Sequence, residues 1–180
     1  TVRTLANDPG SNKTKFGLRK NIIYKGKATV KNGDFEFEFV VPKDISYKLG
    51  KGKISYYTEN TIDDGNGSYF DFFIGGTSNT AISDDNEPEA EIFINDLQFS
   101  FGGLSNEDPL IIGTARDDNG INTVGTGIGH ELTLTIDDGE PIVVNEYYES
   151  ELDDYTSGTI SYPVKGLSEG RHSASLKVWD

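Results

Sequence analysis

The clearest pattern of apolar and polar positions lies between residues 33 and 42. Phe35, Phe37 and Phe39 alternate there with glutamates, and a valine and a proline close the stretch. Side chains on an extended strand point alternately to its two faces, so this stretch predicts a strand with one aromatic face. Three phenylalanines on one face need an apolar surface opposite, and a second sheet provides one most simply.

Similar short apolar stretches recur along the chain and are separated by turn residues. The Asn-Gly pair before the aromatic strand predicts a tight hairpin with the preceding strand. Residues 147–155 are acidic and aromatic, and we expect a helical turn there. The last two strands are expected to form a hairpin. The predicted strands are 21–30, 33–42, 52–59, 68–74, 90–97, 109–115, 132–136, 141–145, 158–164 and 170–180.

Short strands at intervals of about ten residues indicate an all-β protein built from sandwiches. Composition becomes polar and acidic between residues 78 and 91, which places a domain boundary near 82–88. We therefore predict two tandem immunoglobulin-like β-sandwich domains, at 1–84 and 85–180, the second truncated at its C-terminal end. Predicted core residues are Phe35, Phe37, Phe39, Ile54 and Phe72 in the first domain, and Leu132, Leu134, Ile136, Leu176 and Val178 in the second.

Composition excludes several classes of function. The formal net charge is −14, which disfavours nucleic acid and anionic membrane surfaces as partners. The sequence has no cysteine, which excludes disulfides, thiolate catalysis and cysteine-based zinc sites. No apolar run approaches the roughly 20 residues of a membrane span, and none resembles a signal peptide.

Candidate catalytic residues are few, and each has a structural interpretation that we prefer. His130 and His172 are the only imidazoles; His172 is in phase with the apolar face of the last strand, and His130 begins a strand. The pairs Glu36/Glu38 and Glu149/Glu151 could supply two carboxylates, but such spacing on a strand is typical of a solvated face. No catalytic residue is predicted.

Acidic turns are the candidates for binding a metal. Calcium takes six to eight oxygen ligands, and Asp117, Asp118 and Asn119 could supply several of them. None of the turns has the full spacing of an EF-hand. Asp and Asn also favour turns without any metal, so we expect no cofactor, with calcium at these three residues as the alternative.

The acidic, aromatic stretch 145–155 is the candidate contact surface. So many charges are not buried without partners, so the stretch is expected at the surface. Tyr147, Tyr148 and Tyr155 would either cover the open edge of the second sandwich or face a partner protein.

Several stretches together resemble one known family, the PorU-type sortases, which are gingipain-like cysteine peptidases of the type IX secretion system. The resemblance covers nearly the whole chain and falls in the region after the peptidase domain of that family. The stretches that carry it are 21–30, 35–47, 52–57, 117–122, 127–130, 155–158 and 176–180.

The resemblance implies a non-catalytic part of a surface enzyme. The family uses a His–Cys pair in an upstream domain, and this chain has no cysteine, so no catalytic residue carries over. It works on the extracellular side of the outer membrane, where it removes the C-terminal signal of cargo proteins and attaches them to a surface lipopolysaccharide. The partners implied are the upstream peptidase domain and other secretion or outer-membrane proteins. A carbohydrate- or calcium-binding surface module is the alternative.

Overall fold

The structure is a computed structural model that describes residues 2–16, 22–42, 45, 49–76, 78, 86–124 and 129–179. Within these residues the regular structure is β throughout, apart from the short 3-10 helix η1 (Asn145–Tyr147). The prediction of an all-β chain is confirmed.

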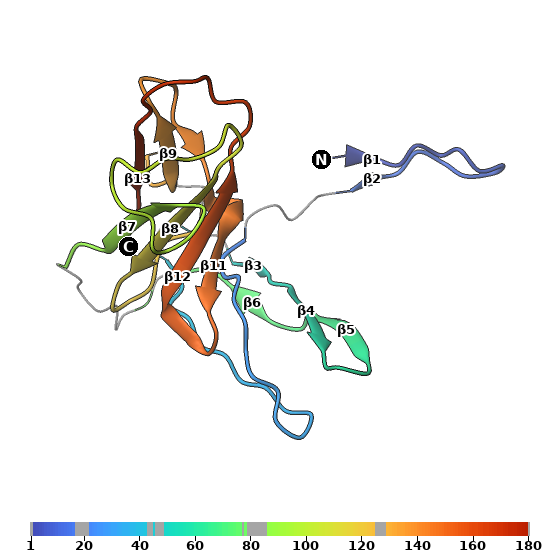
Figure 1. The fold of residues 1–180 in the computed structure, drawn as a ribbon. Coiled ribbons are helices and arrows are strands. Elements are labelled where there is room, and N and C mark those ends of the chain that lie inside the picture. The colour runs from blue at the N-terminus through green and yellow to red at the C-terminus, as the bar shows by residue number, and fades with distance from the viewer. Residues whose placement is uncertain are drawn as a thin grey trace.

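The described residues between 86 and 179 form two antiparallel sheets that pack face to face (Figure 1). The larger sheet has the order β11-β12-β8-β7, and the smaller has the order β10-β9-β13. Their strands are β7 (Glu89–Ile94), β8 (Leu110–Arg116), β9 (Thr133–Ile136), β10 (Ile142–Val143), β11 (Tyr148–Glu151), β12 (Asp154–Pro163) and β13 (Ala174–Lys177). We call this part of the chain the sandwich.

The core of the sandwich lies between the two sheets. Leu134 comes from β9 of the smaller sheet, Leu132 directly precedes that strand, and Ile111 and Ile160 come from the larger sheet; all four are nearly inaccessible to solvent. The alternation of side chains along a strand explains which residues of the larger sheet enter the core, because every second residue of β8 is buried. Ile136, Leu176 and Val178 pack against this core while partly buried, so the predicted core of the second half is confirmed.

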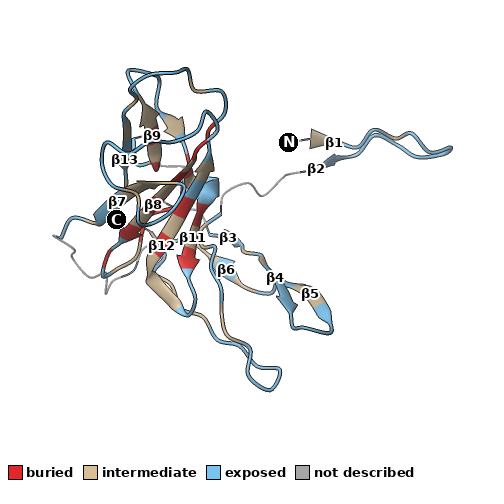
Figure 2. Cartoon of the chain, in the orientation of Figure 1, coloured by how far each residue is buried: buried red, intermediate tan, exposed pale blue. Residues whose placement is uncertain are grey.

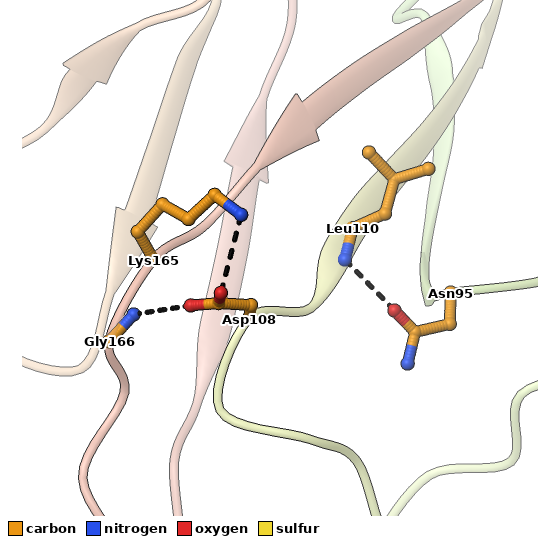
Figure 3. A network of polar contacts seen from close by, with 5 residues as sticks. All are labelled: Asn95, Asp108, Leu110, Lys165 and Gly166. Carbon is orange, nitrogen blue, oxygen red and sulfur yellow. Dashed lines mark hydrogen bonds and ion pairs between the residues drawn. The ribbon is translucent and has the colours of Figure 1, made fainter.

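Polar contacts fix the loops at one end of the sandwich (Figure 3). Asn95 accepts a hydrogen bond from the Leu110 N–H at 2.9 Å through its Oδ1, which ties the end of β7 to the start of β8. Asp108 accepts from the Gly166 N–H at 2.8 Å and pairs with Lys165 at 3.3 Å. The connection after β12 is thereby held beside the start of β8.

The N-terminal half forms small two-stranded ribbons (Figure 1). None of its described residues is buried, and buried positions begin at Pro109 (Figure 2). The pairs are β1 (Val2–Arg3) with β2 (Lys15–Phe16), β3 (Gly50–Lys51) with β6 (Phe73–Ile74), and β4 (Ile54–Glu59) with β5 (Asp64–Tyr69).

A sandwich in the first half is therefore not confirmed, and its predicted core is wrong. Phe35 is 43% exposed, and Phe37, Phe39, Ile54 and Phe72 are only partly buried. The described residues 22–42 form isolated bridges and no strand, so the predicted strands at 21–30 and 33–42 are wrong. Without a sheet there is no second layer to cover the aromatic side chains, which stay accessible. Much of the predicted boundary at 82–88 lies outside the described residues.

Local predictions had mixed outcomes. The hairpin turn is confirmed: Asn32 and Gly33 have φ of 55° and 92°, the positive values of a type I′ turn. The strand predicted at 68–74 begins earlier, since β5 starts at Asp64 and pairs with β4. The final hairpin is wrong, since β12 and β13 belong to different sheets.

The chain exposes far more surface than a compact protein of its size. Its accessible surface is 13471 Å², whereas a compact monomer of 19.7 kDa exposes about 8,600 Å². The ribbons contribute to this excess, because none of their described residues is buried (Figure 2).

Leucine substitutions test where the stability resides. We expect Leu134→Ala to lower the free energy of unfolding by about 2–5 kcal/mol, because it leaves a cavity between the sheets. Leu104→Ala is the matched control: Leu104 is 99% exposed, so its removal should change stability by less than about 0.5 kcal/mol. Chemical denaturation measures both, and equal effects of the two substitutions would contradict this placement of the core.

Candidate interaction surface

Residues 22–31, which we call the clasp segment, run beside the outer strand of the larger sheet (Figure 1). The Ser150 N–H donates to the Lys25 carbonyl at 2.8 Å, and the Asp153 N–H donates to the Lys27 carbonyl at 3.0 Å. A parallel bridge joins Lys27 to Leu152. The clasp segment thus extends the sheet by short pairing at the edge of β11, although the sequence predicted pairing only with residues 33–42.

Charged side chains reinforce this pairing. Glu149 forms ion pairs with Lys27 at 2.6 Å and with Lys25 at 3.4 Å. Asp153 accepts hydrogen bonds from the Thr29 N–H at 2.7 Å and from the Thr29 hydroxyl at 2.5 Å. The hydrogen bond from Lys27 lowers the pKa of Glu149, and those from Thr29 lower the pKa of Asp153, so both contacts favour the ionised carboxylates.

The aromatic side chains of the first half gather against the clasp segment. Tyr24 stacks on Phe39 with ring centroids 4.8 Å apart and on Phe37 at 5.7 Å. Phe35 continues the row, 6.3 Å from Phe37, and contacts Tyr56 of β4 at 5.6 Å. The planes of Phe35, Phe37 and Phe39 are nearly parallel, so each ring of the row turns a face toward its neighbours.

An open groove of about 600 Å³ lies between this aromatic row and the turn from β11 to β12. Its apolar lining includes Phe35 and Phe37. Five carboxylates and two lysines also line it, so the groove is aromatic with an acidic rim. The charged residues are Asp34, Glu36, Glu38, Asp153, Asp154, Lys27 and Lys31.

The tyrosines predicted to contact partners have different surroundings. Tyr148 is 2% exposed and belongs to the core, so its side chain does not reach the surface, and burial raises its pKa to about 12. Tyr147 is 41% exposed and packs edge-on against Tyr162, with centroids 4.9 Å apart. Tyr155 is partly buried and lines the groove. Of the three, Tyr147 and Tyr155 remain accessible to a partner.

His172 is held by two acceptors. Its Nδ1 lies 2.7 Å from the Asp137 carboxylate, and its Nε2 lies 2.9 Å from the Ser168 carbonyl oxygen. An imidazole donates from both nitrogens only when protonated, so these contacts, with Asp137 first, raise the pKa of His172. Neither nitrogen faces a hydroxyl, which leaves His172 without the geometry of a general base beside a nucleophile.

The remaining candidates lie apart from the groove or serve the fold. His130 packs against Trp179, with ring centroids 4.8 Å apart. Asp117 is buried, and its Oδ1 accepts from the Asn119 N–H at 2.7 Å, as in an Asx turn. Among the described residues, no three acidic or imidazole side chains gather as a metal site would require. Asp118 therefore joins no such group.

The clasp is the feature that sequence reasoning missed. Thr29 and Asp153 are separated by 124 positions, and no local pattern connects them. Glu149 and Glu151 were interpreted as a solvated face, which overlooked the two lysines that pair with Glu149. The only signal in the sequence was the pair of lysines at positions 25 and 27, because lysines in so acidic a chain have many carboxylates available as partners.

Removing one carboxylate should release the clasp. We expect Asp153→Asn to speed backbone hydrogen exchange at the amides that donate across the clasp, those of Thr29, Ser150 and residue 153, because Thr29 loses a charged acceptor. Asp138→Asn, in a turn of the other sheet, is the matched control and should leave that exchange unchanged. Acid should mimic the substitution: stabilisation by Glu149 and Asp153 is present above their ordinary pKa values of about 4 and is lost as pH falls through the lowered values. If neither the substitution nor acid changes the exchange rates, the clasp segment is not held by these carboxylates.

The His172–Asp137 pair predicts a second pH dependence. Because the pKa of His172 is raised on folding, its stabilisation is complete below the ordinary value of about 6.5 and is lost as pH rises through the raised value. The pKa of Asp137 is lowered by the same contact, so Asp137 affects stability in acid: its stabilisation is lost as pH falls through the lowered pKa. We expect the melting temperature to fall above neutral pH in the unsubstituted chain and in the His130→Asn variant, but not in the His172→Asn variant. The same fall in His172→Asn would refute this assignment.

Comparison with known proteins gives one informative likeness. No protein-family model and no curated protein matches the chain. Among solved structures, dimeric latent PorU from Porphyromonas gingivalis is 35% identical to it over 99% of this chain, with a TM-score of 0.53. The match covers 17% of the PorU chain. The resemblance seen in the sequence is confirmed: over nearly its whole length, this chain is related to one region of PorU.

Proposed function

We propose that this chain is a non-catalytic β-sandwich region of a cell-surface type IX secretion sortase. It supports or orients the peptidase domain of the parent protein and contacts other secretion or outer-membrane proteins. The likeness to one region of PorU over 99% of this chain carries the proposal. It is supported by the contrast between a sandwich with a buried core and ribbons in which no described residue is buried. Exposed aromatic surface of this extent marks sites where other protein surfaces pack.

The proposal also treats the second half as an immunoglobulin-like domain. Its larger sheet runs β7-β8-β12-β11, which has the A-B-E-D order of that fold. In the smaller sheet, β9 and β13 then take the places of strands C and F, and β10 lies on the outer side of strand C. Such domains serve widely as scaffolds, and their function lies in the surfaces they present.

The proposed lack of catalysis rests on chemistry. A gingipain-like peptidase needs a cysteine nucleophile, and this sequence has none. His172, which is engaged with two acceptors, does not replace it. We assign the cysteine peptidase and sortase activity to a part of the full-length parent protein that lies outside residues 1–180.

The proposed location is the extracellular side of the outer membrane. The relationship to PorU supports it. No helix among the described residues is long and apolar enough to span a bilayer. The acidic rim of the groove and the net charge of −14 favour protein partners with basic or apolar contact surfaces.

Matched phenylalanine substitutions test the proposed support role. We expect Phe35→Glu in the full-length parent to lower its melting temperature and its cleavage of a cargo C-terminal signal, because a charge would enter a packed aromatic contact. In the isolated chain the same change should leave melting nearly unchanged, since Phe35 is 43% exposed there. Phe101→Glu is the control, because Phe101 is fully exposed in the loop after β7.

Two outcomes would count against the proposal. One is a parent protein that is unaffected by Phe35→Glu, or affected equally by Phe101→Glu. The other is cleavage of the signal substrate by the purified 180-residue chain that is abolished by His130→Ala, since catalysis would then reside in this region.

A further inference from the structure

The outer edge of β13 offers unpaired backbone groups. β13 pairs with β9 on one side, and no described strand pairs with its other side. The Asp137 N–H donates to the Ser173 carbonyl at 2.8 Å, which shows that the backbone groups of Ser173 face β9. Backbone groups of an antiparallel strand alternate in direction, so those of Ser175 and Lys177 also face β9. Those of Ala174 and Leu176 must then point outward.

The apolar face beside this edge is incompletely covered. Leu176 seats a methyl group over Gly113 of β8, where a β-carbon would collide with it. Even so, Leu176 and Val178 are only partly buried, as are Ile92 and Ile94 of β7 across the sandwich. β7 and β13 approach each other at this side of the molecule. A strand added beside β13 would lie over β7 and could bury these side chains.

The other sheet edges are protected in ways that β13 is not. β7 follows Pro88 and carries Glu89 and Glu91, residue types that discourage strand addition. β10 is only two residues long, which makes a poor template. The edge of β11 is already occupied by the clasp segment. This sandwich therefore accepts a strand at one edge and presents a second edge that is open.

We propose that the outer edge of β13 receives a β-strand from the parent polypeptide outside residues 1–180, apolar at alternate positions. This inference rests on the proposed function, which makes the chain one region of a longer protein. The occupant is argued from the strand order, in which the place beside strand F of an immunoglobulin-like sheet belongs to strand G. The related PorU chain is about six times as long as the matched region, so a donor segment has a source.

Residue-resolved hydrogen exchange tests the proposal, because the two sides of β13 carry different amides. In the isolated chain, the amides of Ser175 and Lys177 should exchange slowly, and those of Leu176 and Val178 quickly. In the full-length parent, the amides of Leu176 and Val178 should slow by at least about tenfold, as the donor strand pairs with them. Ser175 and Lys177 are the internal controls, since their amides face β9 in both proteins.

Each other outcome overturns the proposal. Fast exchange of Leu176 and Val178 in the parent would show that the edge stays open there. Protection in the isolated chain that grows with its concentration would assign the edge to a second copy. Neither result bears on the proposed support role, which the Phe35→Glu comparison tests separately.

Discussion

Apolar packing between two unequal sheets is the interaction on which the rest of this structure depends. Leu132, Leu134, Ile111 and Ile160 meet between the sheets and lose nearly all their solvent contact. Burial at about 25 cal/mol per Å² of apolar surface makes this the main source of stability. Because the larger sheet has four strands and the smaller has three, no strand of the smaller sheet fully covers β7, and β13 keeps an open edge. Stability and the demand for an additional strand thus have one structural cause.

The N-terminal half depends on this sandwich and has no buried core of its own among its described residues. It is attached through backbone pairing at β11, through Glu149 and Asp153, and through an aromatic row that is only partly covered. Exposed ion pairs contribute little individually, so this attachment is weaker than the core that carries it. A region built in this way is suited to pack against other parts of a larger protein, which agrees with its relationship to a short region of PorU.

Sequence patterns predicted the second half well because local alternation and global packing agree there. Leu132, Leu134 and Ile136 alternate in the sequence, and their side chains pack at one core. Phe35, Phe37 and Phe39 alternate as regularly, yet they stay partly exposed, because a period of two reports a shared face without saying what covers it. Long-range contacts such as that between Thr29 and Asp153 leave no local pattern. The family resemblance was recognisable because it depends on the order of many short stretches, which survives where packing cannot be predicted.

We propose that the sandwich keeps a buried core of its own, whereas the ribbons are covered only in the parent protein. Limited proteolysis followed by mass spectrometry tests it most directly, because cleavage follows local unfolding and exposure. We expect rapid cuts within residues 49–76 of the isolated chain, a resistant product that contains residues 86–179, and protection of residues 49–76 in the full-length parent. Equal resistance of both halves in the isolated chain, or unchanged cutting of residues 49–76 in the parent, would contradict it.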